Sequence, residues 1–191
     1  HHDGFASTVG PFSPALFNTE VEAQEVIEPI LAMAESDDMD CQIEASKILY
    51  DFAMNEDLLP CLCDTRCIDI MILLAQENAP EAARHNIFMT MALLATKSQW
   101  QEVIAEKKEL FCVIMTTVVN GPYETAELRR EGARTFESLS LSRVAHMIPS
   151  KVGKEPLFSW FSSVDDLQDE RLKLHAERAR EALRPFAESA F

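Results

Sequence analysis

The cysteines come closest to the spacing of a metal site. Cys61, Cys63 and Cys67 form a C-x-C-x-x-x-C run, and Cys41 or His85 could supply a fourth zinc ligand. Structural zinc sites commonly use two C-x-x-C pairs, and this chain contains no such pair. An odd number of cysteines with irregular spacing is also not typical of a disulfide framework. We therefore expect reduced thiols that pack as small apolar side chains, and no metal or other cofactor.

The residue types that serve catalysis form no recognisable constellation. Ser140, Ser142 and Ser150 lie near His146, but outside any G-x-S-x-G motif. The acidic run 37–44 lacks the glycine and the ligand spacing of a calcium loop, and instead predicts a loop before the acidic first turn of a helix. The chain also has no glycine-rich phosphate loop. The sequence thus predicts no catalytic residue and a protein that is not an enzyme.

Length and composition favour a single helical domain. The chain has 191 residues, of which 47% are hydrophobic and only five are glycine. This content indicates a sizeable core, and few glycines argue against a turn-rich β fold. The densest apolar runs are about half the length of a membrane-spanning helix, which needs roughly 20 residues, so we expect no membrane insertion. We expect a cytoplasmic protein, with the interior of a mitochondrion or another organelle as the alternative.

Charge is distributed unevenly along the chain, whose formal net charge is −15. Residues 1–65 contain 14 acidic residues and a single base, Lys47. Residues 66–191 are nearly balanced, with 18 acidic and 16 basic residues. The first segment contains what we call the acidic pole: Glu20, Glu22, Glu25, Glu28, Glu35, Asp37, Asp38 and Asp40. Such a surface repels phosphate backbones and attracts a basic peptide or protein face, although it also serves solubility.

Apolar residues recur with the spacing of amphipathic helices, and two patterns repeat along the chain. The first pattern, apolar at the first, fourth, fifth and eighth positions, occurs at 27–34, 68–75, 111–118 and 157–164. The second pattern, small or apolar at the first, fifth, eighth and ninth positions, occurs at 45–53, 87–95, 132–140 and 179–187. Both patterns shift together by about 41 to 47 residues, a period typical of helical repeats.

With this period, the chain resembles the armadillo and HEAT repeat family. Residues 45–55 are similar to the second helix of an armadillo repeat, and residues 67–75 are similar to its third helix. The resemblance covers residues 20–188 as four imperfect repeats, preceded by an extended arm at 1–19. It implies an all-α solenoid, an α-α superhelix of about four short repeats. An ordinary helical bundle without repeats is the alternative.

The resemblance further implies a protein-binding scaffold without enzymatic activity. In the importin-α and β-catenin type, a Trp and an Asn on one helix of each repeat line the groove. Here those positions hold Lys47 and Asp51, Met89 and Leu93, Arg134 and Ser138, and Glu181 and Pro185. The family's asparagine ladder is therefore missing, and we do not expect recognition of nuclear-localisation peptides. We expect a partner segment to contact Lys47, Asp51, Met89, Arg134 and Ser138, aided by Glu28, Asp37 and Asp38.

A structural accessory subunit of a large multiprotein assembly, organellar or not, is the alternative function. Self-association is a further option, because a basic stretch lies towards the other end of the chain, although Glu131 and Glu137 dilute it. The members of this stretch are Arg129, Arg130, Arg134, Arg143, Lys151 and Lys154. Nucleic acid is not an expected partner.

Several local features are also predicted. Loops are expected at 36–38, 78–80, 120–122 and 149–156, where Pro, Gly, Asn or Asp gather. Trp160 and Phe161 are expected to pack inside the last repeat. Residues 165–183 are expected to form a polar capping helix, with Ser163 or Asp165 as its N-cap.

Overall fold

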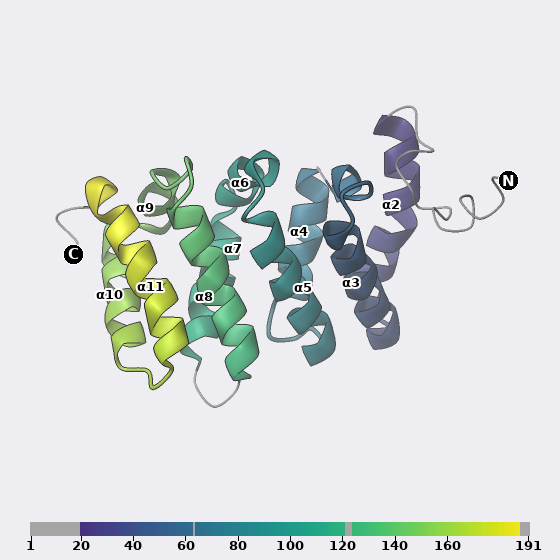
Figure 1. Cartoon of the computed structure of the whole chain (residues 1–191). Coiled ribbons are helices and arrows are strands. Elements are labelled where there is room, and N and C mark those ends of the chain that lie inside the picture. The colour runs from purple at the N-terminus through teal and green to yellow at the C-terminus, as the bar shows by residue number, and fades with distance from the viewer. Residues whose placement is uncertain (1–19, 63, 121–123, 188–191) are drawn as a thin grey trace, which may run out of the picture. The chain divides into compact units, whose positions relative to one another are not determined.

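Figure 1 shows the computed structural model of the chain, which describes residues 20–62, 64–120 and 124–187. Within these residues the chain forms α-helices and short 3-10 helices, and no strand. The predicted all-α class is therefore confirmed. The predicted arm at 1–19 lies outside the described residues, as does Cys63.

The chain divides into two compact units, residues 1–87 and 88–191. The helices of unit 1 are α2 (Glu20–Glu35), α3 (Met39–Met54), η2 (Leu59–Leu62) and α4 (Thr65–Leu74). The division falls inside α5 (Glu81–Leu94). The helices of unit 2 are α6 (Ser98–Ala105), α7 (Lys108–Val119), α8 (Ala126–Ser140), α9 (Met147–Val152), α10 (Lys154–Asp165), α11 (Glu170–Leu183) and η4 (Arg184–Phe186).

Short polar side chains start several of these helices by accepting hydrogen bonds from first-turn amides. Asp38 accepts from the amides of Asp40 and Cys41, at 2.8 and 3.2 Å. Thr125 does the same at the start of α8, and Asp64 at the start of α4. The predicted loop at 36–38, followed by an acidic helical turn, is therefore confirmed.

The predicted loop at 149–156 is wrong. Both α9 and α10 run through this segment, and only Gly153 separates them, with a φ of 95° that favours glycine. Pro149 and Pro156 each lie in the first turn of their helix, where proline is tolerated because the amide would have no intrahelical partner.

The predicted N-cap of the last long helix is also wrong. Ser163 and Asp165 belong to the last turn of α10, and α11 starts only after Asp169. Asp169 caps α11 by accepting from the Leu172 amide at 3.1 Å. The hydroxyl of Ser163 instead donates to the Ser159 carbonyl within α10.

The two repeating apolar patterns coincide with the buried sides of the helices. Every position of the first pattern, on α2, α4, α7 and α10, is buried except Met115, which is half-buried. Every position of the second pattern, on α3, α5, α8 and α11 with η4, is buried except Phe186, which is 44% exposed. The amphipathic pattern predicted from the sequence is therefore confirmed helix by helix.

An aromatic cluster forms the core of unit 2. The Phe136 ring of α8 lies 6.1 Å from Phe111 of α7 and 4.7 Å from Trp160 of α10. Phe161 completes the cluster, and the indole N–H of Trp160 donates to the Met115 carbonyl at 2.9 Å. The predicted packing of Trp160 and Phe161 is thus confirmed, since both are buried. Each aromatic pair adds about 0.5–1.5 kcal/mol beyond its buried area.

These contacts arrange unit 2 as two layers of helices. The first layer contains α8 and α11, and the second contains α7 and α10, as Figure 1 shows. The short helix α9 packs against α7 and α10. The long helices α8 and α11 therefore keep one side open to solvent.

A side-chain hydrogen bond recurs at the same place in three consecutive pairs of helices. In each pair, the residue three positions before a copy of the second pattern donates from its side chain to a backbone carbonyl near the end of the preceding helix. Gln42 donates to the Ser36 carbonyl at 2.7 Å, Arg84 to Ala75 at 3.1 Å, and Arg129 to Val118 at 2.8 Å. These carbonyls lack intrahelical partners at helix ends, so the bond ties each long helix to the one before it.

None of the helices in the described part of the chain combines the length and the apolar character that crossing a membrane requires.

Candidate functional site

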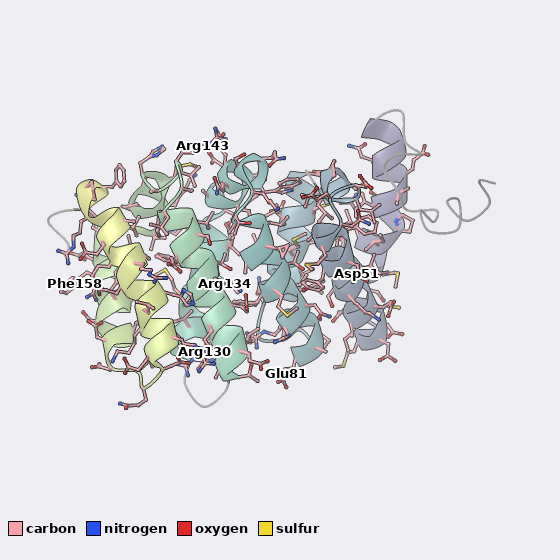
Figure 2. All side chains as sticks on the ribbon, viewed as in Figure 1. Asp51, Glu81, Arg130, Arg134, Arg143 and Phe158 are labelled. Atoms are coloured by element: carbon pink, nitrogen blue, oxygen red, sulfur yellow. The ribbon has the colours of Figure 1, made fainter. Side chains whose placement is uncertain are left out.

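The open side of α3 carries part of the predicted contact surface. Lys47 and Asp51 are both exposed and lie one helical turn apart. Asp40 and Glu44 extend this line towards the start of the helix, and exposed Met54 ends it. Figure 2 shows Asp51 on the open side of α3. The stripe combines three carboxylates, one ammonium group and a flexible apolar side chain.

The acidic pole is partly neutralised by a base that the sequence analysis did not assign to it. Arg66, at the start of α4, lies 2.6 Å from Glu28 and 3.2 Å from Glu35 of α2. Hydrogen bonds to Glu28 and to Glu35 raise the pKa of the Arg66 guanidinium above its ordinary value. All three side chains are about half exposed, so these ion pairs contribute little to stability.

The other acidic residues of the pole differ in whether their carboxylates are available to bind a partner. Asp38 is exposed, but its carboxylate is engaged as the N-cap of α3. Asp37 is exposed in the loop between α2 and α3. The side chains of Glu20 and Glu22 lie outside the described part of the structure.

The remaining predicted contact residues belong to unit 2. Met89 is half-buried on α5. Arg134 and Ser138 lie one turn apart on α8, and Arg134 is exposed while Ser138 is half-buried. Figure 2 shows Arg134 on the open side of α8. The predicted set is thus divided between the units, with Lys47 and Asp51 in unit 1.

A partly buried polar network, not predicted from the sequence, joins α8 to α11. The Glu137 carboxylate accepts hydrogen bonds from His175 Nδ1 and, at 3.4 Å, from Arg178 Nη1. Seven residues before Glu137, about two helical turns, Arg130 pairs with Asp169 at 2.8 Å. Burial raises the pKa of the Asp169 carboxyl, but hydrogen bonds from the Leu172 amide and from Arg130 outweigh it, and the pKa lies below its ordinary value.

The cysteines show no arrangement for metal binding among the residues described. Cys61 and Cys67 are buried, Cys41 is half-buried and Cys112 is exposed. No group of three or more His, Cys, Asp or Glu side chains in the described ranges could hold a metal ion. Burial raises the pKa of the Cys61 thiol, against a smaller effect of its backbone hydrogen bond, so the thiol is a poor nucleophile.

The serines near His146 use their hydroxyl groups for backbone hydrogen bonds. Ser140 donates to the Phe136 carbonyl and Ser142 to the Leu139 carbonyl, both at 2.7 Å. The His146 ring pairs through Nδ1 with the Arg143 carbonyl. These geometries place neither Ser140 nor Ser142 as a nucleophile activated by His146.

No family model matches the chain, and a search of the curated proteins finds no match. Among solved structures, three crystal structures of engineered proteins from the Northeast Structural Genomics Consortium share its fold. The first has a TM-score of 0.64 at 16% identity, and covers 82% of this chain and 62% of its own. The second has the same score and identity, and covers 86% of this chain and 39% of its own. The third has a TM-score of 0.57 at 13% identity, and covers 88% and 87%.

At these identities the similarity is one of fold alone. The chain spans less than two thirds of the length of the first two engineered proteins.

Proposed function

We propose that this chain is a protein-interaction module built as an armadillo-like solenoid, a superhelix of about four short repeats without enzymatic activity. The order of its helices supports a repeat. A short helix, a medium helix and a long helix follow one another as η2, α4 and α5, then as α6, α7 and α8, and again as α9, α10 and α11.

The observation that carries this proposal is the hydrogen bond donated by Gln42, Arg84 and Arg129. It recurs in step with both buried patterns, so the equivalence of successive helices extends from apolar spacing to one defined polar contact. Repeats of this kind contact only their neighbours, and each leaves its outward face free. A row of such faces is a surface for another polypeptide.

On unit 1, charge favours a basic segment as the partner. The stripe of α3 and the loop before it present Asp37, Asp40, Glu44 and Asp51 to solvent, with Lys47 among them. Glu28 and Asp38 have intramolecular partners, so we assign the main attraction to Asp37 and Asp51. Exposed Met54 adds an adaptable apolar contact. Met89, Arg134 and Ser138 remain the proposed contacts on unit 2.

The test is the binding of a fluorescein-labelled peptide of alternating lysine and leucine, followed by fluorescence anisotropy. Replacing both Asp37 and Asp51 by lysine should weaken binding about tenfold or more at about 50 mM NaCl. Raising the salt to about 300 mM should weaken binding to the unmodified chain, because screening removes the steering charge. The same affinity at both salt concentrations would contradict the proposal.

A control variant tests whether a change in total charge alone weakens binding. Asp166→Lys makes the same change in charge as Asp51→Lys alone, with which it is compared, at an exposed residue at the end of α10. Lysine is favourable at a helix C-terminus, so this variant should fold normally and retain the affinity of the unmodified chain.

A permanent subunit of a larger assembly is the second candidate. Large apolar side chains that are exposed on unit 2 favour it, because a permanent partner would cover them: Leu141, Phe158 and Phe186. Native purification from the source cell, followed by mass spectrometry, should then recover the chain with partners of fixed stoichiometry. Recovery as a free monomer favours the first candidate.

A further inference from the structure

The open side of α8 and α11 presents more positive charge than the sequence indicates. Arg130 and Arg134 are four residues apart on α8, so they lie on the same side of the helix. Arg171, Leu174 and Arg178 follow one side of α11 at spacings of three and four. We call these five residues the α8–α11 face. Figure 2 shows Arg130 and Arg134 on α8, where it lies beside α11.

Contacts between the helices place both rows on one surface. Arg130 reaches across to Asp169, at the start of α11, at 2.8 Å. Arg178 reaches back to Glu137 of α8, which follows Arg134 by three residues. The two rows of side chains therefore meet along the line where α8 packs against α11.

Depth separates the two signs of charge on this surface. The carboxylates lie low, because the side chains of Glu137, Asp169 and Glu131 are 10%, 13% and 24% exposed. The guanidinium groups lie above them, with Arg134 at 57% and Arg178 at 56%. The sequence suggested that Glu131 and Glu137 dilute the basic stretch. In the structure their carboxylates lie beneath the guanidinium groups of Arg134 and Arg178, which remain the exposed groups.

The ion pairs beneath the surface leave the arginines available to a second anion. Arg134 lies 3.4 Å from Glu131, and Arg178 lies 3.4 Å from Glu137, which also accepts from His175. These are long contacts that use one nitrogen of each guanidinium group. A guanidinium group has five N–H donors and pairs with two carboxylates in different directions.

The exposed carboxylates of α11 on this side are engaged by other bases. Glu170, Glu177 and Glu181 pair with Lys173, Arg180 and Arg184. On α8, Glu127 is exposed seven residues before Arg134. The three carboxylates of α11 are thus held by bases outside the α8–α11 face.

We infer that the α8–α11 face binds an acidic polypeptide segment that carries apolar side chains. Its carboxylates pair with Arg134 and Arg178, and an apolar side chain covers exposed Leu174, which lies between Arg171 and Arg178. Charge complementarity selects this occupant, and the apolar contact favours a polypeptide over a nucleic acid. The inference goes beyond the proposed function, because it assigns to unit 2 a partner opposite in charge to the partner of unit 1.

The experiment is a titration of the whole chain into a fluorescein-labelled peptide of alternating glutamate and leucine, at about 50 mM NaCl. Neutralising both arginines, with Arg134→Gln and Arg178→Gln, should weaken binding about tenfold or more. The single reversal Arg134→Glu should weaken it further than Arg134→Gln does. Circular dichroism melting verifies folding, and the single variants at exposed Arg134 provide a measurement that does not disturb Glu137.

Arg143 provides the matched control. It is an exposed arginine of the same unit, between α8 and α9, which donates to the Ser98 carbonyl at 3.3 Å and is shown away from Arg134 in Figure 2. Arg143→Gln and Arg143→Glu should leave binding of the acidic peptide unchanged. A loss equal to that of the Arg134 variants would overturn the inference, because it would reflect total charge alone.

Two further probes identify the class of partner. A peptide with glutamine in place of glutamate should bind at least tenfold more weakly than the acidic peptide. A uridylate dodecamer that binds more tightly than the acidic peptide, and loses affinity in the Arg134 variants, would overturn the assignment to an acidic polypeptide. Failure of this inference is distinguishable from failure of the proposed function, because the basic-peptide assay uses variants of Asp37 and Asp51 in unit 1 and leaves Arg134 and Arg178 unchanged.

Discussion

Gly132 faces two side chains that leave little room for a larger residue on α8. A Cβ atom added there would lie 3.1 Å from Val118 Cγ2 and 3.2 Å from Phe88 Cε1. We expect Gly132→Leu to lower the free energy of unfolding by about 1–3 kcal/mol, because overpacking forces its neighbours to shift. Urea denaturation measures this change. In Gly132→Ala, a gain of about 1 kcal/mol in helix propensity opposes the close contact, so the effect is smaller.

An exposed position on the same helix is the control for that substitution. Ala126→Leu, at the solvent-facing start of α8, should change the free energy of unfolding by less than about 0.5 kcal/mol. An unchanged urea midpoint for Gly132→Leu would show that Val118 and Phe88 move aside freely.

Single residues were predictable where their partners lie nearby in sequence. The loop at 36–38 was predicted from its polar residues before an acidic helical turn, and the burial of Trp160 from the helical spacing of apolar residues. The N-cap role of Asp38 was not predicted. Arg66, His175 and Arg178 were missed as partners of carboxylates, because each bonds to a residue about 40 positions earlier. Such pairs depend on which helices pack together, and no local pattern encodes them.

At the scale of the helix, Asp169 combines the N-cap of α11 with the ion pair to Arg130. We expect Asp169→Ala to lower the free energy of unfolding by about 0.5–2 kcal/mol at pH 7, as for other lost N-caps. Asp169→Asn should cost less, because asparagine is an equally good cap and only the charge is removed. Asp166→Ala, at the end of α10, is the control and should have little effect.

The pH dependence of these variants separates the charge from the cap. Because the pKa of Asp169 is lower in the folded chain than in the unfolded chain, its charge stabilises the fold fully above the unfolded value of about 3.9. This stabilisation disappears as the pH falls through the folded value. The difference between the unmodified chain and Asp169→Asn in urea denaturation should therefore shrink from pH 7 towards about pH 2. A difference that persists in acid would contradict this assignment.

Whole helices were easier to predict from the sequence than the junctions between them. The long and medium helices carry several buried positions at regular spacing, and these positions define them. The short helix α6 was not predicted, because its eight residues contain only Trp100, Ile104 and Ala105 as buried anchors. Pro149 and Pro156 led to the wrong prediction of a loop, because proline breaks a helix in its interior but is accepted in its first turn, where both residues lie.

On the scale of the whole molecule, the sequence predicted the all-α class and the buried side of each long helix. Core positions follow the helical period, because apolar burial selects them. The contact residues proposed for a partner, such as Asp51 and Arg134, lie on the other side, where solubility permits many residue types. Their positions were predictable, but which of them engage internal ion pairs was not. The α8–α11 face emerges only when the depth of each charge is known.

The uneven charge of the molecule predicts that salt stabilises its two units unequally. Residues 1–87 contain 17 acidic and three basic residues, whereas residues 88–191 contain 15 acidic and 14 basic residues. Repulsion among the carboxylates of unit 1 opposes its compact state, and salt screens this repulsion. Raising NaCl from about 20 to about 300 mM should therefore slow amide hydrogen exchange in α2, α3 and α4. Exchange in α8 and α11 should change much less, since their charges are balanced by ion pairs. Mass spectrometry of the exchanged peptides measures both effects, with KCl as a control for specific ions. Equal protection of both units would show that internal ion pairs such as Arg66 with Glu28 already offset the repulsion.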